Sequence, residues 1–392
     1  MPRIEEVKRL IEVLVSIGVK VDWQESGDIV ITPPSTFDLS KIDKDAASRT
    51  RSIAMFAAPL AHLLGSFELP APTGCDLGKR SLGAHIDALQ KLGIEITGNE
   101  NAHSYHVETK GVHPAEIIMY EASDTGVENV LMAAAKIPGK TTIKFASANY
   151  MVQDLCFFLQ TCGVKIDGVG TTTLVVEGVK DINANLIGYP SEDPIESMFF
   201  IALAATTGSE IKIERCPMDF LELELYTLTQ MGLQYERGEP YMSENGHTIL
   251  RDLTIKKSKL VGAPEKIAPR PYPGINIDNL PFFVPVATQA KGQTMIHDWV
   301  YDGRAKHYME MAKLGAKMEM LDPHRVVIEG PTKLHAATVE APPALRPATL
   351  LLIGMLAAEG ESMLKNVYPI SRGYENLHER LAKLGASVEA VE

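Results

Sequence analysis

The residues with the clearest chemical potential lie in one short stretch, Thr73-Gly74-Cys75-Asp76-Leu77-Gly78-Lys79-Arg80. A cysteine bracketed by two glycines is followed closely by two cations. Positive charge beside a thiol stabilises the thiolate, so the usual pKa of about 8.5 falls toward neutrality. Glycine lets the backbone approach a ligand closely, and a guanidinium binds anions. The stretch is typical either of a reactive thiol beside an anion site or of a turn that happens to contain a cysteine.

The composition is that of a folded protein with more acidic than basic residues. The chain has 392 residues, 45% of them apolar and 22% charged, and a formal net charge of −12. Because one core rarely serves much more than about 150 residues, we expect two or three domains. The negative charge argues against a general nucleic-acid partner and against a membrane-surface role.

Cysteine usage and the apolar runs make a reducing cytoplasm the simplest expected location. The four cysteines show no metal-ligand spacing, so we expect no metal site. We also expect no N-terminal signal. The longest apolar runs, such as Phe199–Ala205 and Leu350–Ala358, are much shorter than the roughly 20 residues that span a bilayer.

An internal repeat positions these residues. A helical phrase, a glycine suited to a left-handed helix C-cap, and a strand-like phrase recur in that order six times. The six copies are Leu10–Val21, Leu89–Ile96, Phe158–Ile166, Leu228–Tyr235, Met311–Met318 and Leu381–Val388. Their glycines are separated by roughly 70 to 80 residues, a spacing typical of a supersecondary unit rich in strands and helices.

A second phrase, a helix of small residues that closes in glycine before a strand, lies between these copies. It occurs five times, at Ser52–Leu69, Asn129–Ile143, Ser197–Ile211, Phe282–Met295 and Thr349–Met363. Five copies against six predict that Pro2–Val21 is the second half of a unit whose first half is absent. The alternative is that the fold does not need that half.

Three repeats per domain is the natural division. The segment Asn183–Glu192, which contains glycine, proline and serine, is the best linker, so we expect one domain over residues 1–189 and another over 190–392. Glu236–Ala268 resembles a hairpin excursion around a strand at Thr248–Ile255. The alternation of strands and helices predicts an α/β or α+β protein.

Several further motifs, in order along the chain, resemble those of the enolpyruvyl transferase family. They are Arg51, Pro59-Leu60, Gly74-Cys75, Gly78, Arg80 and His85, then Ser123–Asn129, Pro271–Asp278, Arg304–His307, Leu345-Arg346 and Arg372–Glu375. The resemblance covers the chain from about Pro2 to the C-terminus. It implies an α/β (α+β) fold of two domains, an inside-out α/β barrel built from six βα repeat units, here with the first unit truncated.

The same resemblance implies a reaction. The most similar branch of the family transfers the enolpyruvyl group of phosphoenolpyruvate to the 3′-hydroxyl of UDP-N-acetylglucosamine in peptidoglycan precursor synthesis, and releases phosphate. The resemblance implies no metal and no organic cofactor, no nucleic-acid or membrane partner, and a monomer.

Two residues match the family's catalytic groups. Cys75 matches the cysteine credited with general-acid and covalent-adduct roles, and Asp278 matches the carboxylate that accepts the hydroxyl proton. The alternative role for Asp278 is to cap the helix expected at Asn279–Ala287. We expect Cys75 and Asp278 to converge across a hinge.

The other matches imply substrate contacts. A planar guanidinium holds carboxylate and phosphate with two hydrogen bonds, which suits the family's anionic substrates. The matching residues are Arg51, Arg80 and Arg372 for phosphoenolpyruvate, Arg304 and Arg346 at further cleft positions, His85 near the cysteine loop, and Ser123, Thr125 and Gly126 near the nucleotide diphosphate. His85 is equally consistent with a satisfied helix residue.

The chain departs from the family pattern at two anion-binding positions. The family's N-terminal Lys-Asn pair has no counterpart, and Glu121 replaces a lysine before the Ser123 motif. Two hypotheses therefore stand: an active carboxyvinyltransferase, or a catalytically idle homologue that binds a nucleotide-sugar or a protein partner. A shikimate-pathway relative is disfavoured, because that branch does not use this cysteine loop.

Overall fold

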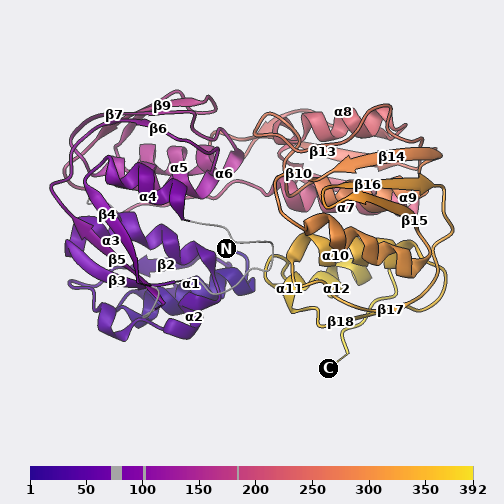
Figure 1. Ribbon diagram of the computed structural model, residues 1–392, viewed down its shortest axis with the longest axis horizontal. Coiled ribbons are helices and arrows are strands. Elements are labelled where there is room, and N and C mark those ends of the chain that lie inside the picture. The colour runs from indigo at the N-terminus through magenta and orange to yellow at the C-terminus, as the bar shows by residue number, and fades with distance from the viewer. Residues whose placement is uncertain (72–81, 100–102, 183–184, 392) are drawn as a thin grey trace. The chain divides into compact units, whose positions relative to one another are not determined.

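The computed structural model describes residues 1–71, 82–99, 103–182 and 185–391. The chain divides into two compact units, of which the first ends at Gly188 and the second begins at Tyr189 (Figure 1). Each unit is described below by itself.

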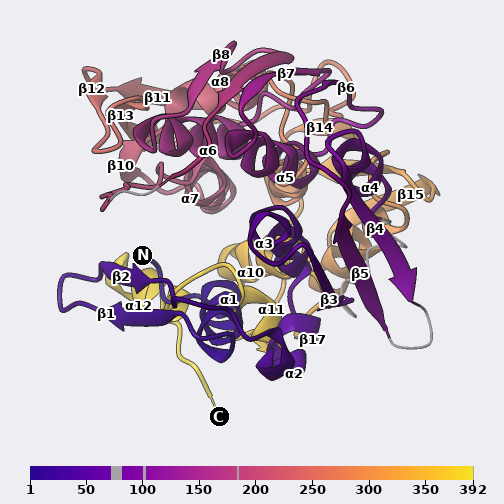
Figure 2. The same ribbon diagram turned by 90° about the vertical axis from the view of Figure 1, so that its left-hand side faces the viewer.

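The first unit contains three sheets and the helices that pack between them. Its helices are α1 (Glu5–Ser16), α2 (Lys44–Ser48), α3 (Ala57–Leu64), α4 (Gly83–Gln90), α5 (Asp124–Ala135) and α6 (Tyr150–Thr161), with 3₁₀ turns η1 (Leu39–Lys41) and η2 (Arg51–Phe56). Its strands are β1 (Lys20–Trp23), β2 (Ile29–Thr32), β3 (Ser66–Pro70), β4 (Ile94–Asn99), β5 (Ser104–Thr109), β6 (Glu116–Ile118), β7 (Gly139–Lys144), β8 (Lys165–Asp167) and β9 (Thr173–Gly178). The strand orders are β1-β2, β3-β5-β4 and β6-β7-β9-β8. Figure 2 shows β3, β5 and β4 as neighbouring strands.

The second unit has the same organisation. Its helices are α7 (Pro194–Thr207), α8 (Glu222–Gln230), α9 (Phe283–Gln289), α10 (Leu345–Ala357), α11 (Tyr368–Ser371) and α12 (Leu377–Lys383), with η3 (Met218–Phe220), η4 (Leu280–Phe282) and η5 (Arg304–Leu314). Its strands are β10 (Ile211–Cys216), β11 (Gln234–Arg237), β12 (Tyr241–Met242), β13 (Ile249–Lys256), β14 (Gly292–His297), β15 (Lys317–Asp322), β16 (Arg325–Gly330), β17 (Thr338–Glu340) and β18 (Met363–Lys365). The orders are β10-β13-β11 with β12 beside β13, β14-β16-β15, and β17-β18.

Helices form the interior of each unit, and the sheets lie around them. In α7 every residue except Glu196 and Thr207 is buried. A helix that is buried all round must lie in a core. The strands instead alternate between buried and accessible positions, as β9 and β16 do, which is typical of sheets with one face toward a core. This helix-inside arrangement is what the expected inside-out barrel requires.

The repeated glycines take the conformation that the sequence predicts. All six have positive φ, between 84° at Gly93 and 101° at Gly18. Five of the six are followed by the predicted strand, namely β1, β4, β8, β11 and β15. The sixth strand, expected after Gly385, is wrong: the described residues 386–391 form none. A strand requires a partner for its backbone hydrogen bonds, and no described strand pairs with this segment.

Four sheets have a central strand that pairs antiparallel with strands on both sides, namely β5, β9, β13 and β16. The strand predicted at Thr248–Ile255 is confirmed as β13, whereas the repeated phrases did not predict β5, β9 and β16. β12 and β13 form the expected hairpin, and β13 is at the same time the central strand between β10 and β11.

Candidate active site

The predicted base, Asp278, lies in the loop immediately before η4 of the second unit. Its side chain is 38% exposed, and its backbone N–H donates to Oδ1 of Asn276 at 2.9 Å. The structure does not support the alternative prediction that Asp278 caps the following helix. Asn279 precedes η4, and no side-chain hydrogen bond caps it.

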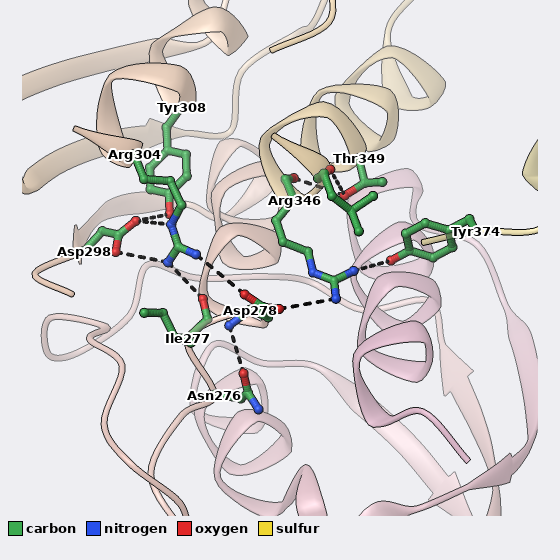
Figure 3. Close-up of polar contacts among 10 residues, drawn as sticks. Asn276, Ile277, Asp278, Asp298, Arg304, Tyr308, Arg346, Thr349 and Tyr374 are labelled. Carbon is green, nitrogen blue, oxygen red and sulfur yellow. Dashed lines mark hydrogen bonds and ion pairs between the residues drawn. The ribbon is translucent and has the colours of Figure 1, made fainter. Parts of the chain in front are cut away.

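Two arginines flank the Asp278 carboxylate from opposite sides (Figure 3). Nη1 of Arg304 lies 3.9 Å from Oδ1, and Nη2 of Arg346 lies 3.4 Å from Oδ2. Both separations are longer than a strong charge-assisted hydrogen bond of 2.7–2.9 Å. The two guanidinium groups therefore surround this carboxylate with positive charge without enclosing it.

Arg304 is held by a buried network that the sequence analysis did not anticipate. Its side chain is 1% exposed, and Nε and Nη2 donate to the carboxylate of Asp298 at 2.6 and 3.0 Å. The hydroxyl of Tyr308 donates to the same carboxylate, and burial raises the pKa of Tyr308 well above its ordinary value, so it remains a donor. Nη2 of Arg304 also donates to the carbonyl of Ile277 at 2.9 Å. Arg304 was predicted to bind an anion, but most of its hydrogen bonds are made to Asp298 and Ile277 of the protein itself.

A second buried acid holds the same loop from α8. Glu224 is 1% exposed, and its Oε1 accepts hydrogen bonds from the backbone N–H of Asn276 and the side chain of Asn279, each at 2.9 Å. Burial raises the pKa of Glu224, although these hydrogen bonds oppose the rise. The loop that presents Asp278 is thus attached to two elements, through Glu224 on one side and Arg304 on the other.

Arg346, the second cation, is positioned by an aromatic cluster. It lies in the first turn of α10, and Nη1 is 3.5 Å from the hydroxyl of Tyr374, whose ring centroid is 5.2 Å from that of Phe199. Gly373 brings this segment against α10, because a Cβ there would lie 2.4 Å from Cδ2 of Leu345. Arg372, a further predicted ligand, is half-buried at the C-terminal end of α11.

In the first unit, His85 connects three elements through a buried network. Nδ2 of Asn129 lies 3.1 Å from Nδ1 of His85 and donates to the carbonyl of Ala54, while Oδ1 of Asn129 accepts from the N–H of Ala58. Because Nδ1 accepts, Nε2 carries the proton and donates to Oγ1 of Thr125 at 3.2 Å. These contacts favour a positioning role for His85, which is 5% exposed.

His85 is uncharged in this setting. Burial, with the charge of Arg51 as a second cause, lowers its pKa to about 4. The structure therefore brings the predicted residues Arg51, His85 and Thr125 within electrostatic or hydrogen-bond range of one another.

The first turn of α5 is capped by its own side chains. Oγ of Ser123 accepts a hydrogen bond from the N–H of Gly126 at 3.1 Å, as an N-cap residue does. The Asp124 carboxylate accepts from Ser147 and from Asn149. The turn expected near a nucleotide diphosphate thus carries a carboxylate of its own.

The predicted residues Cys75 and Arg80 lie outside the described part of the chain. The three described cysteines are poor nucleophiles. Burial raises the pKa of Cys156 to about 12 and that of Cys216 to about 11, and it also raises the pKa of Cys162. Cys75 is the thiol for which the sequence predicts reactivity. None of the three described thiols is a better candidate, because the pKa of each is raised.

The described residues contain neither a membrane-spanning helix nor a metal-binding cluster. No helix there is long and apolar enough to cross a membrane. No group of three or more histidine, cysteine, aspartate or glutamate side chains there is arranged to hold a metal ion.

Two units, each with helices inside and sheets around them, define a fold shared with solved enolpyruvyl transferases. The solved enolpyruvyl transferase NikO from Streptomyces tendae superposes with a TM-score of 0.82 at 22% identity, over 99% of this chain and 88% of that one. An EPSP synthase from Acinetobacter baumannii gives a TM-score of 0.72 at 16% identity, over 99% and 89%. These matches confirm the predicted two-domain inside-out α/β barrel fold.

Sequence comparison then assigns the family. The model for EPSP synthase (3-phosphoshikimate 1-carboxyvinyltransferase) matches residues 1–381, and the chain belongs to this family of enolpyruvyl transferases. A UDP-N-acetylglucosamine 1-carboxyvinyltransferase from Treponema denticola is 33% identical over all of this chain and 90% of the relative. One from Thermobifida fusca is 31% identical over 99% and 88%.

Three residues of the second-unit site were not predicted from the sequence: Asp298, Tyr308 and Glu224. Tyr374 lies within the predicted motif Arg372–Glu375, but no role was assigned to it. A weak signal existed for Asp298, which directly follows β14 and stands six residues before Arg304. Tyr308 and Glu224 are common residue types in helical segments, and only their burial distinguishes them.

Proposed function

We propose that this protein transfers the enolpyruvyl group of phosphoenolpyruvate to the 3′-hydroxyl of UDP-N-acetylglucosamine, in peptidoglycan precursor synthesis in the cytoplasm. The proposal is supported by relatives of that name at about 30% identity over the whole chain. The structural observation that supports it most is Asp278, an accessible carboxylate between the guanidinium groups of Arg304 and Arg346.

The proposed reaction is an addition followed by an elimination. The sugar oxygen forms a bond to C2 of phosphoenolpyruvate, its proton goes to Asp278, and Cys75 supplies a proton to C3. The C2–O bond to phosphate then breaks, the Cys75 thiolate takes a proton back from C3 to restore the double bond, and phosphate departs with the proton that Asp278 had accepted. Arg346 and Arg372, with Arg51 and Arg80 in the first half of the chain, balance the carboxylate and phosphate charges.

Phosphate release tests this proposal. Purified protein with phosphoenolpyruvate and UDP-N-acetylglucosamine is expected to release phosphate, and Cys75→Ala and Asp278→Asn are each expected to lower kcat by at least about 100-fold, the usual range for lost acid–base catalysis. Cys162→Ala and Asp45→Asn are matched controls on other elements and are expected to retain activity.

Two outcomes would contradict the proposal. Release with shikimate 3-phosphate but not with the UDP-sugar would assign a different acceptor. No release with either acceptor, together with UDP-sugar binding by calorimetry, would identify an idle homologue.

A further inference from the structure

We propose that Asp298 is a positioning residue that acts through Arg304 to fix the peptide and carboxylate of Asp278. This inference rests on the proposed function, in which Asp278 accepts the hydroxyl proton. Asp298 is 0% exposed, so it has no access to a substrate and its effect on Asp278 passes through other groups.

Asp298 orients the guanidinium of Arg304. It binds Arg304 along one edge, through Nε and Nη2, with two hydrogen bonds to its two carboxylate oxygens. Such a fork fixes the plane of the guanidinium as well as its position. Tyr308 completes the anchor by donating to Oδ2 of Asp298.

Asp298 is itself held by the sheet. Its N–H donates to the carbonyl of His324 at 2.8 Å, and Nδ1 of His324 lies 2.9 Å from the Asp298 carbonyl oxygen. Its backbone therefore has a fixed place beside the turn between β15 and β16.

The oriented guanidinium of Arg304 contacts both the peptide before Asp278 and the Asp278 carboxylate. Nη2 donates to the carbonyl of Ile277, the residue before Asp278, and Nη1 points toward the Asp278 carboxylate at 3.9 Å (Figure 3). Asp298 thus determines which edge of Arg304 faces Asp278. It also supplies the negative charge that balances a cation buried to 99%.

The proposal divides the two arginines by role. Arg304 is a positioning residue whose hydrogen bonds are mostly committed to Asp298 and Ile277. Arg346 is 16% exposed, so it is more accessible than Arg304, and its contacts to Asp278 and Tyr374 are 3.4 and 3.5 Å long.

The test compares Asp298→Asn with Asp45→Asn. Asp45 also pairs with an arginine, Arg49, at 2.9 Å, but on the exposed surface of α2 in the first unit. Asp298→Asn is expected to lower kcat by up to about 100-fold, the size that a misplaced catalytic group produces, with a change in KM for phosphoenolpyruvate below about threefold. Asp45→Asn is expected to leave both constants unchanged.

Tyr308→Phe is the milder companion variant, because it removes one hydrogen bond and keeps the ring. It is expected to lower kcat in the same direction by a smaller factor. A thermal unfolding scan of each variant measures how much folded protein contributes to the rate.

A spectroscopic readout separates positioning from general stability and does not depend on turnover. In protein labelled with ¹³Cγ-aspartate, the Asp278 resonance is identified by its loss in Asp278→Asn. It is expected to shift in Asp298→Asn and Tyr308→Phe, and to stay in place in Asp45→Asn.

An unchanged Asp278 resonance in the Asp298 and Tyr308 variants, or a wild-type kcat in folded Asp298→Asn, would overturn the positioning role. Failure of the proposed function has a different signature, because the wild type would then release no phosphate while the Asp278 resonance still responds to Asp298→Asn.

Discussion

Asp278 and Asp298 are both paired with Arg304, yet their surroundings give them different capabilities. Asp298 is fully buried and spends both oxygens on Arg304 and Tyr308. Asp278 is 38% exposed, and its two arginine partners lie beyond 3.3 Å. A carboxylate that accepts a substrate proton needs access and weak competing contacts, so of these two residues only Asp278 suits that role.

The four thiols also differ in expected reactivity. We expect iodoacetamide at pH 7 to modify Cys75 faster than Cys156, Cys162 and Cys216, because burial raises the pKa of each of these three thiols. Mass spectrometry of proteolytic peptides measures the site of modification.

Cys75→Ser is the control for this experiment and should abolish the rapid phase. Equal labelling of all four thiols, or rapid labelling confined to Cys162, would count against a low-pKa thiol at Cys75.

At the scale of elements, α4 and α5 are joined by polar groups inside an apolar core. His85 from α4 meets Thr125 and Asn129 from α5, and Asn129 also bonds the backbone at Ala54 and Ala58. Asn129 is completely buried, so its hydrogen bonds satisfy groups that water cannot reach. This connection fixes the start of α4.

This connection predicts a pH dependence of stability. The pKa of His85 is about 4 in the folded protein against 6.5 for an ordinary histidine, so the unfolded chain binds more protons between these values. The contribution is fully present above pH 6.5 and is lost as pH falls toward 4. Between pH 7.5 and 4.5 it amounts to about 2 to 3 kcal/mol of unfolding free energy.

His85→Gln removes this titration while keeping a polar side chain. Urea unfolding at the two pH values should show a smaller loss of stability in the variant than in the wild type. The carboxylates titrate in both proteins and cancel in the comparison. An equal loss in both would mean that His85 is protonated in the folded state at pH 4.5.

At the scale of the molecule, the proposed substrates are anionic and the chain carries a net charge of −12. The anions must therefore be held by local cations, since the overall field opposes them. On the second unit Arg346 beside Asp278 is such a local cation, since Asp298 balances the charge of Arg304.

Substrate binding should stabilise the whole protein. UDP-N-acetylglucosamine at 100 times its Kd is expected to add about 2.7 kcal/mol to the unfolding free energy, because it binds the folded state alone. The rise in Tm in a calorimetric scan measures this effect. UMP with free N-acetylglucosamine at the same concentration is the control, and an equal shift in that control would show that the linked sugar is not recognised as one ligand.

Much of the fold followed from local patterns. The six repeat glycines, with positive φ at each, and five of the six following strands came from short stretches, because a helix, its left-handed cap and the next strand are specified by adjacent residues. Family motifs likewise pointed to Asp278, Arg346 and Ser123 by sequence spacing alone. The reactive loop around Cys75 remains a prediction of this kind.

Tertiary structure decided what depends on distant partners. β5, β9, β13 and β16 acquire their central places only through antiparallel pairing on both sides, and the segment after Gly385 is no strand because it lacks such a partner. The position of Arg304 in the sequence fits an anion ligand, but burial against Asp298 commits its hydrogen bonds to the protein. Charge and residue type are properties of the chain, whereas desolvation and hydrogen-bond partners arise only when the chain is packed.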